Sequence, residues 1–582
     1  MTRALDTFAD RRCTLLGIET TPVSEADRFG AKALAMLVAG RNETAANAVL
    51  KECAEWFEHP VRAGLNGHQG ECDFSAIKLC RAYHLFAGGA PLAAETLASI
   101  RTFFTRKNFA SIYQSENHAL LFHTSRHLMA QAYAGDFFQA YEKTGEQLAA
   151  EDGAWLRRFI RYRAGHGWGE FDSVGYLGPV WECLTCLHDF SADQELKRLS
   201  GSMMDLLLAD MAVDSLHGMY CGAHGRIYPP HAMDHVTEPS RILYYLYFGG
   251  IPTDGMEHHG FIIDALTSTY RPHPIVVDIA LNRCTAYENR ERKQLHNLAD
   301  VLPVAPLTGS LRKYTYYTPL YALGCVQFQD AYPACCAHHN HHEIPVMADQ
   351  RDTAAYAHHQ QHQWDLSFAT GTTARLFTHH PGTDGTHNYW TGDRLCGCGH
   401  FFQHKQALVA LYNIPASQPL QFIHAYLPRD AFDEVIEENG WIFARAGDAF
   451  AGLWLSSAYH WTNEGEWADR EIISAGLKHA VICEAGTTDN YVDFTAFRHA
   501  IAGNPVHFDR EPMTLDYRSR QAGPLQIDSQ GGRFQNEHPA DLDYGSYDSP
   551  YLYSAWGSGV IEMKSGSSRR ILDFNLTTLS PP

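Results

Sequence analysis

The spacing of the apolar residues changes once along this chain of 582 residues, close to residue 300. Before that point apolar residues recur every three or four positions, as Leu196, Leu199 and Met203 do, and this spacing is typical of amphipathic helices. After "VLPVAPLTGSLRKY" (301–314) the segments are short, rich in β-branched and aromatic residues, and bounded by Gly, Asn and Asp, as antiparallel strands are. We therefore predict a helical domain over residues 1–305 and a β domain over residues 306–582.

The helical part is a row of stretches of similar length separated by short breaks. They cover about residues 28–57, 74–88, 92–106, 117–134, 143–164, 172–189 and 191–214. Such a row favours antiparallel helical hairpins, and the lack of a clean sequence repeat favours a closed toroid over a solenoid. The predicted fold class is α+β and multidomain: an N-terminal (α/α) toroid or incomplete barrel, then a C-terminal antiparallel β-sandwich. Ser191 with Gln194 predicts a capping box at the start of the last stretch.

Composition excludes several partners. The net charge of −20 argues against nucleic acid and anionic membranes, because a phosphate-binding surface needs clustered Lys and Arg. The N-terminal "MTRALDTFADRRCTLLG" lacks the apolar stretch of a signal peptide, and no later segment reaches the ~18 apolar residues of a membrane span. The 14 Cys form no recognisable disulfide framework. We expect a cytoplasmic protein with reduced thiols; the sequence sets no oligomeric state.

Ionisable and aromatic residues concentrate in four breaks of the helical part. These are "NGHQGECDF" (66–74), "SENH" (115–118), "GHGWGEFDSVGY" (165–176) and "CGAHGRIY" (221–228). In a toroid the loops at one end surround a single cleft, so we predict that these breaks converge there. The side chains expected to bind a substrate in this cleft are Asp73, His123, Arg126, Trp168 and Asp172. No phosphate-binding loop, dinucleotide fingerprint or GxSxG elbow is present.

The helix that follows Ser115 carries a polar stripe. Steps of three and four residues align Glu116, His123 and His127 on one face, as a helix lining the lumen of a toroid requires. The alternative is that Glu116 stabilises the positive end of the helix dipole and that both histidines are solvated or lie in the core. His123 and His127 also have the i, i+4 spacing of metal ligands, but Thr124 replaces the Glu of the zinc-protease motif, and we predict no metal here.

Two further breaks offer groups for acid–base chemistry. Glu170 or Asp172 could pair with Glu116 as the two carboxylates of a glycosidase, and Asp172 could instead cap the next helix. Arg226 could bind a substrate carboxylate, and His224 or Tyr228 could transfer protons. The alternative is that Arg226 has a structural role, because an Arg after a helix often donates hydrogen bonds to the exposed carbonyls of the helix end.

The β part is rich in His and Cys. The segments 335–345, 357–364, 379–390 and 396–406 hold enough of both for a structural zinc site, although no paired CxxC framework is present. The alternative is that these loops pack against the toroid and complete the cleft. Acid–base chemistry by the side chains named above requires no cofactor, and we expect none.

A helical toroid followed by a β-sandwich, with Asn, His, Tyr and Arg gathered in the breaks between helices, resembles in architecture the polysaccharide lyases of the heparinase and chondroitin or alginate lyase type. The motifs "ENH", "GxxEFxS" and "HGRxY" are similar to those of a separate group, uncharacterised heparinase-like proteins. The architectural resemblance implies β-elimination on a uronate-containing, and so acidic, oligosaccharide or polysaccharide. It implies that Asn117, supported by Arg226, neutralises the uronate carboxylate, and it offers these residues for proton transfer: His118 or His224 as the base, Tyr176 or Tyr228 as the acid. Asn117 and His118 diverge by about 100° on a helix, so both can serve one substrate only at the edge of the cleft.

Two other functions stay open. The first is a glycoside hydrolase on a similar toroid, using Glu116 with Glu170 or Asp172. The second is a non-catalytic carbohydrate-binding protein whose aromatic side chains stack on sugars. Because no export signal is visible, we expect short imported oligosaccharides rather than intact polymer.

Overall fold

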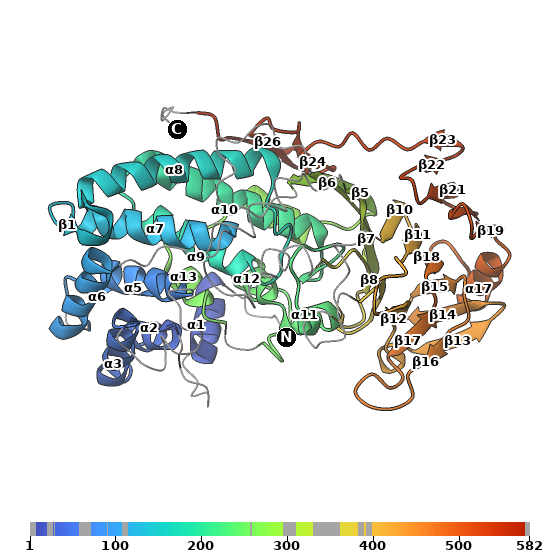
Figure 1. Cartoon of the computed structure of the whole chain (residues 1–582), viewed down its shortest axis with the longest axis horizontal. Helices are drawn as coiled ribbons and strands as arrows, with labels where there is room; N and C mark the ends of the chain where they lie inside the picture. The colour runs from blue at the N-terminus through green and yellow to red at the C-terminus, as the bar shows by residue number, and fades with distance from the viewer. Residues whose placement is uncertain are drawn as a thin grey trace.

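The computed structural model describes residues 7–19, 27, 29–57, 71–89, 91–107, 115–256, 259–294, 310–329, 361–381, 389–390 and 398–576. Figure 1 shows helices gathered on one side of the molecule and sheets on the other. The predicted fold class is confirmed: the N-terminal half is helical and the C-terminal half is antiparallel β. The first strand of the large sheet, β5, begins at Tyr287. The division into domains at residue 305 stays a prediction, because residues 295–309 are not described.

The described helices of the N-terminal half close on themselves. They are α1 (Phe8–Glu19), α2 (Ala31–Val38), α3 (Glu43–Ala54), α5 (Cys72–Phe86), α6 (Ala94–Arg106), α7 (Glu116–Ala132), α8 (Gly145–His166), α9 (Leu177–Phe190), α10 (Gln194–Asp214), α11 (Pro229–Met233), α12 (Pro239–Phe248), α13 (Ile262–Thr267) and α14 (Pro274–Leu281), with the two-residue strands β1 (Phe137–Phe138), β2 (Lys143–Thr144), β3 (Ser215–Leu216) and β4 (Met219–Tyr220) between them. α1 contacts α12 and α13, and α2 contacts α13. Early helices therefore meet late ones, as in a toroid, whereas a solenoid keeps them apart.

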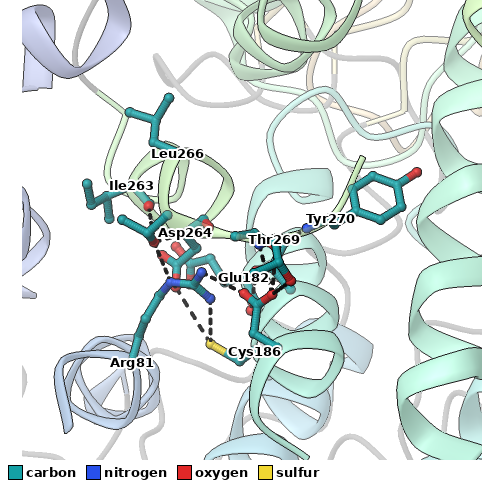
Figure 2. A network of polar contacts seen from close by, with 12 residues as sticks. Arg81, Glu182, Cys186, Ile263, Asp264, Leu266, Thr269 and Tyr270 are labelled. Carbon is teal, nitrogen blue, oxygen red and sulfur yellow. Dashed lines mark hydrogen bonds and ion pairs between the residues drawn. The ribbon is translucent and has the colours of Figure 1, made fainter. Parts of the chain in front are cut away.

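A buried ionic network joins α5, α9 and α13. We call it the helix network; it comprises Lys78, Arg81, Glu182, Asp189 and Asp264. Lys78 Nζ lies 2.6 Å from Glu182 Oε1 and also pairs with Asp264, and Arg81 Nη2 lies 2.8 Å from Asp189 Oδ2. Figure 2 shows the Arg81 guanidinium beside Asp264 and Glu182. Burial raises the pKa of Glu182 to about 7, and the Lys78 charge opposes this shift.

Among the described residues of the C-terminal half, the strands form three antiparallel sheets. The largest has twelve strands in the order β16-β17-β12-β9-β8-β7-β6-β5-β24-β25-β26-β27, the second has the order β10-β11-β18-β15-β14-β13, and the third has the order β19-β20-β21-β22-β23. The bounds are β5 (Tyr287–Gln294), β6 (Ser310–Tyr317), β7 (Tyr321–Gln329), β8 (Trp364–Phe368), β9 (Arg375–His379), β10 (Gly399–His404), β11 (Ala407–Asn413), β12 (Phe422–Tyr426), β13 (Glu434–Glu438), β14 (Trp441–Ala446), β15 (Ala449–Leu455), β16 (His460–Trp461), β17 (Glu471–Ala475), β18 (Lys478–Thr487), β19 (Val506–Asp509), β20 (Thr514–Ser519), β21 (Gly523–Asp528), β22 (Arg533–Gln535), β23 (His538–Pro539), β24 (Tyr547–Asp548), β25 (Leu552–Ser554), β26 (Val560–Ser565) and β27 (Ser568–Asp573).

The central strands of the six-stranded sheet are buried on both faces. Along β11, Leu408 and Ala410 belong to the core that also includes the large sheet and the helices. Val409 and Leu411 point the other way, into a second core with α17 (Phe494–Ala502) and the five-stranded sheet. Because successive side chains of a strand face opposite sides, this alternation gives the predicted sandwich a third layer.

Candidate active site

A cavity lies beside the N-terminus of α7, next to α10 and β4. The space between its walls, counted together with the adjoining open solvent, is about 420 Å³. The lining residues are Glu116, Trp168, Glu170, Asp172, Ser173, Tyr176, Leu177, Val180, Leu207, Asp210 and Tyr220. Most of the wall is the segment 168–180, which we call the wall segment. The breaks "SENH" and "GHGWGEFDSVGY" therefore meet at one cavity, where aromatic rings and carboxylates face the same space.

Glu116 fixes the backbone of the wall segment. Its Oε1 accepts a hydrogen bond from Glu170 N at 2.7 Å, and its Oε2 accepts one from Gly169 N at 3.1 Å. Arg163 Nη2, from α8, lies 2.8 Å from the same Oε2. Burial raises the pKa of Glu116 to about 7; the Arg163 charge opposes this shift and the Glu170 charge adds to it. The position from which Glu170 extends is thus set by Glu116.

Asn117 and Arg226 converge on the carboxylate of Glu170. Asn117 Nδ2 donates to Glu170 Oε2 at 2.8 Å, and Arg226 Nη1 donates to Glu170 Oε1 at 2.5 Å. Arg226 has left-handed backbone, with φ of 57°. Asn117 Oδ1 and Arg226 Nε are buried and have no hydrogen-bond partner among the described residues. Two predicted catalytic groups therefore meet on one carboxylate, and each keeps an unused hydrogen-bonding atom. We call Glu116, Asn117, Glu170, Asp172, Tyr176 and Arg226 the cavity network.

Two tyrosines lie next to Arg226. The hydroxyls of Tyr176 and Tyr228 are 2.6 Å apart, and Arg226 Cζ lies 3.9 Å from the centroid of the Tyr176 ring. Burial raises the pKa of Tyr176 well above its usual range, although the Arg226 charge opposes the shift. At neutral pH Tyr176 is therefore a phenol, which can donate a proton.

Asp172 is held by two lysines of the large sheet. Lys313 Nζ, on β6, lies 2.5 Å from Asp172 Oδ2, and Lys293 Nζ, on β5, lies 3.2 Å from Asp172 Oδ1. Burial opposes ionisation, but the two lysine charges hold the pKa of Asp172 well below its usual range. Asp172 also has positive φ, 49°. It anchors the wall segment to the sheet; α9 begins later, at Leu177, so Asp172 does not cap it.

Asp172, Asp210 and Glu291 have oxygens within 4.8 Å of one another, and within the part of the chain that the structure describes they form the one group of side chains spaced as metal ligands. Lys293 Nζ pairs with all three, at 3.2, 2.7 and 3.5 Å. The ammonium group of Lys293 thus supplies the positive charge that these carboxylates face, and we assign no metal to them.

His118 faces α5. Its Nδ1 lies 2.6 Å from Asp73 Oδ2, and its ring packs edge-on against Phe74 with centroids 5.1 Å apart. Neither His118 nor Asp73 is among the residues that line the cavity. Neighbouring residues of a helix diverge by about 100°, and here that divergence separates His118 from Asn117. Residues 66–70 of the same predicted break lie outside the described residues.

His123 and Arg126 meet Asp152 of α8. His123 Nδ1 lies 2.7 Å from Asp152 Oδ1, and Arg126 pairs with both carboxylate oxygens at 2.5 and 2.6 Å. The His123 ring stacks on Trp155 with centroids 3.9 Å apart. His127 Nδ1 lies 2.8 Å from Ala149 O. Beyond Glu116, the polar stripe of α7 therefore packs against α8 and does not line the cavity, which corrects the expectation of a lumen-lining face.

His224 joins the wall segment to β4. Its Nδ1 lies 2.7 Å from Asp172 O and its Nε2 lies 2.9 Å from Tyr220 O. Burial lowers the pKa of His224 to about 3, and the Lys313 charge adds to the shift. Since both ring nitrogens face backbone carbonyls, neither is offered to a substrate.

The segments behind the zinc prediction fall largely on residues outside the described part: 335–345, 357–360, 382–388 and 396–397. Of the described histidines, His379 and His424 lie opposite each other on β9 and β12. His362 Nδ1 is 3.2 Å from His379 Nε2, and His424 Nδ1 is 2.8 Å from Glu471 Oε1. A structural zinc in these loops stays a prediction.

The sequence-based prediction missed the cations behind the carboxylates, namely Arg163, Lys293 and Lys313. One signal was available for the strand residues: in "YENRERKQ" (287–294), Glu291 and Lys293 stand two apart and so share one face of a strand. Both are buried, and that face meets α10 and the wall segment. Arg163 carried no local signal, because its partner Glu116 lies on another helix.

No protein-family model and no curated protein matches this chain. Among solved structures, the Streptomyces coelicolor A3 chondroitin AC lyase in complex with chondroitin sulphate is similar, with 10% sequence identity and a TM-score of 0.38 over 97% of this chain and 88% of that chain. Among the described helices, none is both long enough and apolar enough to span a membrane.

Proposed function

We propose that this protein is a carbohydrate-active lyase that cleaves a uronate-containing glycan by β-elimination. The observation that supports this most is the convergence of Asn117 and Arg226 on one carboxylate at the cavity wall. An amide N–H and a guanidinium bind carboxylates well, and a uronate carboxylate neutralised in this way makes the neighbouring C5 proton more acidic. A site for β-elimination must therefore contain groups that neutralise this carboxylate.

The remaining roles follow from what lines the cavity. Tyr176 is the proton donor to the leaving glycosidic oxygen, and Tyr228, 2.6 Å away, supports it through their shared hydrogen bond. Trp168 supplies an aromatic face for a sugar ring. Glu116 and Asp172 hold the wall segment in place.

The experiment uses hyaluronan, chondroitin, heparan sulphate and alginate oligosaccharides. The ultraviolet absorbance of an unsaturated uronate is recorded while reducing ends are counted. We expect new reducing ends together with absorbance for at least one substrate, and a loss of both in Asn117→Ala. The matched control is Asn47→Ala, because Asn47 bonds to Glu43 O and Pro91 O in a distant part of the helical half. Absence of the absorbance from every reaction would contradict the proposal.

A glycoside hydrolase is the second candidate, because burial raises the pKa of Glu116 to about 7 beside Glu170, which Arg226 pairs with. A protonated and an ionised carboxyl group are the pair that a glycosidase uses. Against it, Glu116 accepts from two backbone N–H groups and faces Arg163. New reducing ends without absorbance would favour the hydrolase, and binding without any product would favour a carbohydrate-binding protein.

A further inference from the structure

Glu170 occupies the place that the proposed function gives to the substrate. Its carboxylate receives Asn117 Nδ2 on one oxygen and Arg226 Nη1 on the other, and it lines the cavity. These are the two groups assigned to a uronate carboxylate. Placing a second carboxylate on the same largely buried guanidinium would add an uncompensated negative charge, which is costly where little water reaches it. A substrate carboxylate and the Glu170 carboxylate therefore compete for the same donors.

The backbone around Glu170 is fixed, whereas its side chain has rotatable bonds. Glu116 binds the N–H groups of residues 169 and 170, and Gly225 N donates to Phe171 O at 2.7 Å. The main chain is thus held on both sides of Glu170. An exchange of carboxylates needs only a rotation of the Glu170 side chain, with no movement of the wall segment.

We infer that a substrate carboxylate displaces Glu170 from Asn117 and Arg226, and that the displaced Glu170 carboxylate is the base that removes the C5 proton. This inference rests on the proposed function. The C5–H bond breaks and its proton goes to Glu170; its electron pair forms the C4–C5 double bond as the C4–O bond breaks. The Tyr176 hydroxyl gives its proton to the leaving oxygen, and the proton on Glu170 restores Tyr176 before the next turnover, so that no other reactant is required.

The other candidate bases are less well placed. His118 Nδ1 faces Asp73 of α5, and both nitrogens of His224 face carbonyl oxygens. Among the carboxylates of the lining, Asp172 and Asp210 are paired with lysines of the sheet, which a substrate would not compete for. Glu170 differs from them because its hydrogen-bond donors, Asn117 and Arg226, are the groups that would bind the substrate carboxylate.

The test of exchange does not require turnover. The binding of free glucuronate and of its methyl ester is measured calorimetrically on the wild type and on Glu170→Ala. We expect glucuronate to bind about tenfold more tightly to Glu170→Ala, because no internal carboxylate competes, and the uncharged ester to show no such gain. Equal glucuronate affinities for the two proteins would overturn the inference.

The test of the base uses a substrate that the wild type converts to an unsaturated product. Glu170→Gln should lower kcat by about 10²- to 10⁴-fold with KM unchanged or lower, and formate should restore part of the activity of Glu170→Ala. Glu182→Gln is the matched control, a buried, lysine-paired Glu of the helix network, and should keep wild-type kcat. Full kcat in Glu170→Gln would overturn this inference and leave the lyase proposal intact, whereas absence of unsaturated product in the wild type would instead reject the lyase.

Discussion

The helix network and the cavity network are both buried ionic clusters that join segments far apart in the sequence. Each contains a glutamate whose pKa burial raises to about 7, Glu182 in the one and Glu116 in the other. Each also contains a buried polar atom without a hydrogen-bond partner among the described residues, such as Glu182 Oε2 and Asn117 Oδ1. Neither a perturbed pKa nor an unsatisfied atom therefore sets the cavity network apart from the helix network.

Two features do separate them. The helix network lies on the regular helices α5, α9 and α13, and none of its members lines the cavity. Four of the six members of the cavity network line an open space, and two members, Asp172 and Arg226, are non-glycine residues with positive φ. Backbone of that kind is kept only where the surroundings enforce it. The comparison predicts that changes in the first network affect folding and that changes in the second affect chemistry.

The largest expected effect is on stability. Lys78→Met leaves the carboxylates of Glu182 and Asp264 buried without their shared cation. Breaking a buried pair from one side costs about 3–5 kcal/mol, which urea denaturation would show as a lowered free energy of unfolding. Lys51→Met, which removes a solvent-exposed pair with Glu55, should lower the free energy of unfolding far less, because water screens an exposed ion pair. Comparable losses of unfolding free energy in the two variants would contradict the role in stability that the comparison gives to the helix network.

Arg226→Lys should affect activity instead. A lysine keeps the charge but cannot both bind Glu170 and lie flat over the Tyr176 ring. We expect kcat/KM for an oligosaccharide that the protein cleaves by β-elimination to fall about 10³-fold. This corresponds to a loss of about 4 kcal/mol of transition-state stabilisation, and the melting temperature should be nearly unchanged. A large fall in melting temperature with normal activity per folded molecule would place Arg226 with the structural cations.

The pH dependence of stability should be shared by the two networks. Glu116 and Glu182 have a pKa raised from 4.5 to about 7 in the folded state. Between these values the folded protein binds more protons than the unfolded chain, so both groups lower stability as the pH rises through that window and have no further effect above it. Glu182→Gln should remove part of this pH dependence. In urea denaturation followed from pH 5 to pH 8, the fall in the free energy of unfolding over that range should become smaller by up to about 3 kcal/mol.

Glu116→Gln provides the contrast within the same measurement. Like Glu182→Gln, it should make the free energy of unfolding depend less on pH. It should also lower activity, because Glu116 positions the backbone of residues 169 and 170. An unchanged slope in both variants would show that neither carboxyl group titrates in this range.

The sequence predicted the elements of the fold better than their ends. The start of α7 after Ser115 is confirmed, because Glu116 is its first helical residue. The capping box of Ser191 and Gln194 is wrong: α10 begins at Gln194 and Asp193 caps it, accepting from Glu195 N and Leu196 N. Several polar residues in a row can each act as a cap, and the choice among them depends on packing, which periodicity does not report.

The members of the candidate site were easier to predict than its geometry. The breaks identified Glu116, Asn117, Glu170 and Arg226, and the structure brings them together. What the sequence could not give is their pairing, because a carboxylate and an arginine tens of residues apart carry no sign that they bind each other and not a ligand. The prediction that the polar face of α7 lines the cleft failed for a related reason, because the partner of this face, Asp152, lies on the next helix.

The smallest expected effect tests that last correction. His123 stacks on Trp155 and contacts Asp152, which Arg126 also binds with two hydrogen bonds. Removing the His123 ring by His123→Ala should cost about 1 kcal/mol of stability and change kcat/KM by less than about twofold, because Arg126 still pairs with Asp152. Trp168→Ala is the comparison, since Trp168 lines the cavity and its loss should raise KM. A tenfold rise of KM in His123→Ala would mean that the stripe on α7 does reach the substrate, and the cavity would then have to extend along that helix.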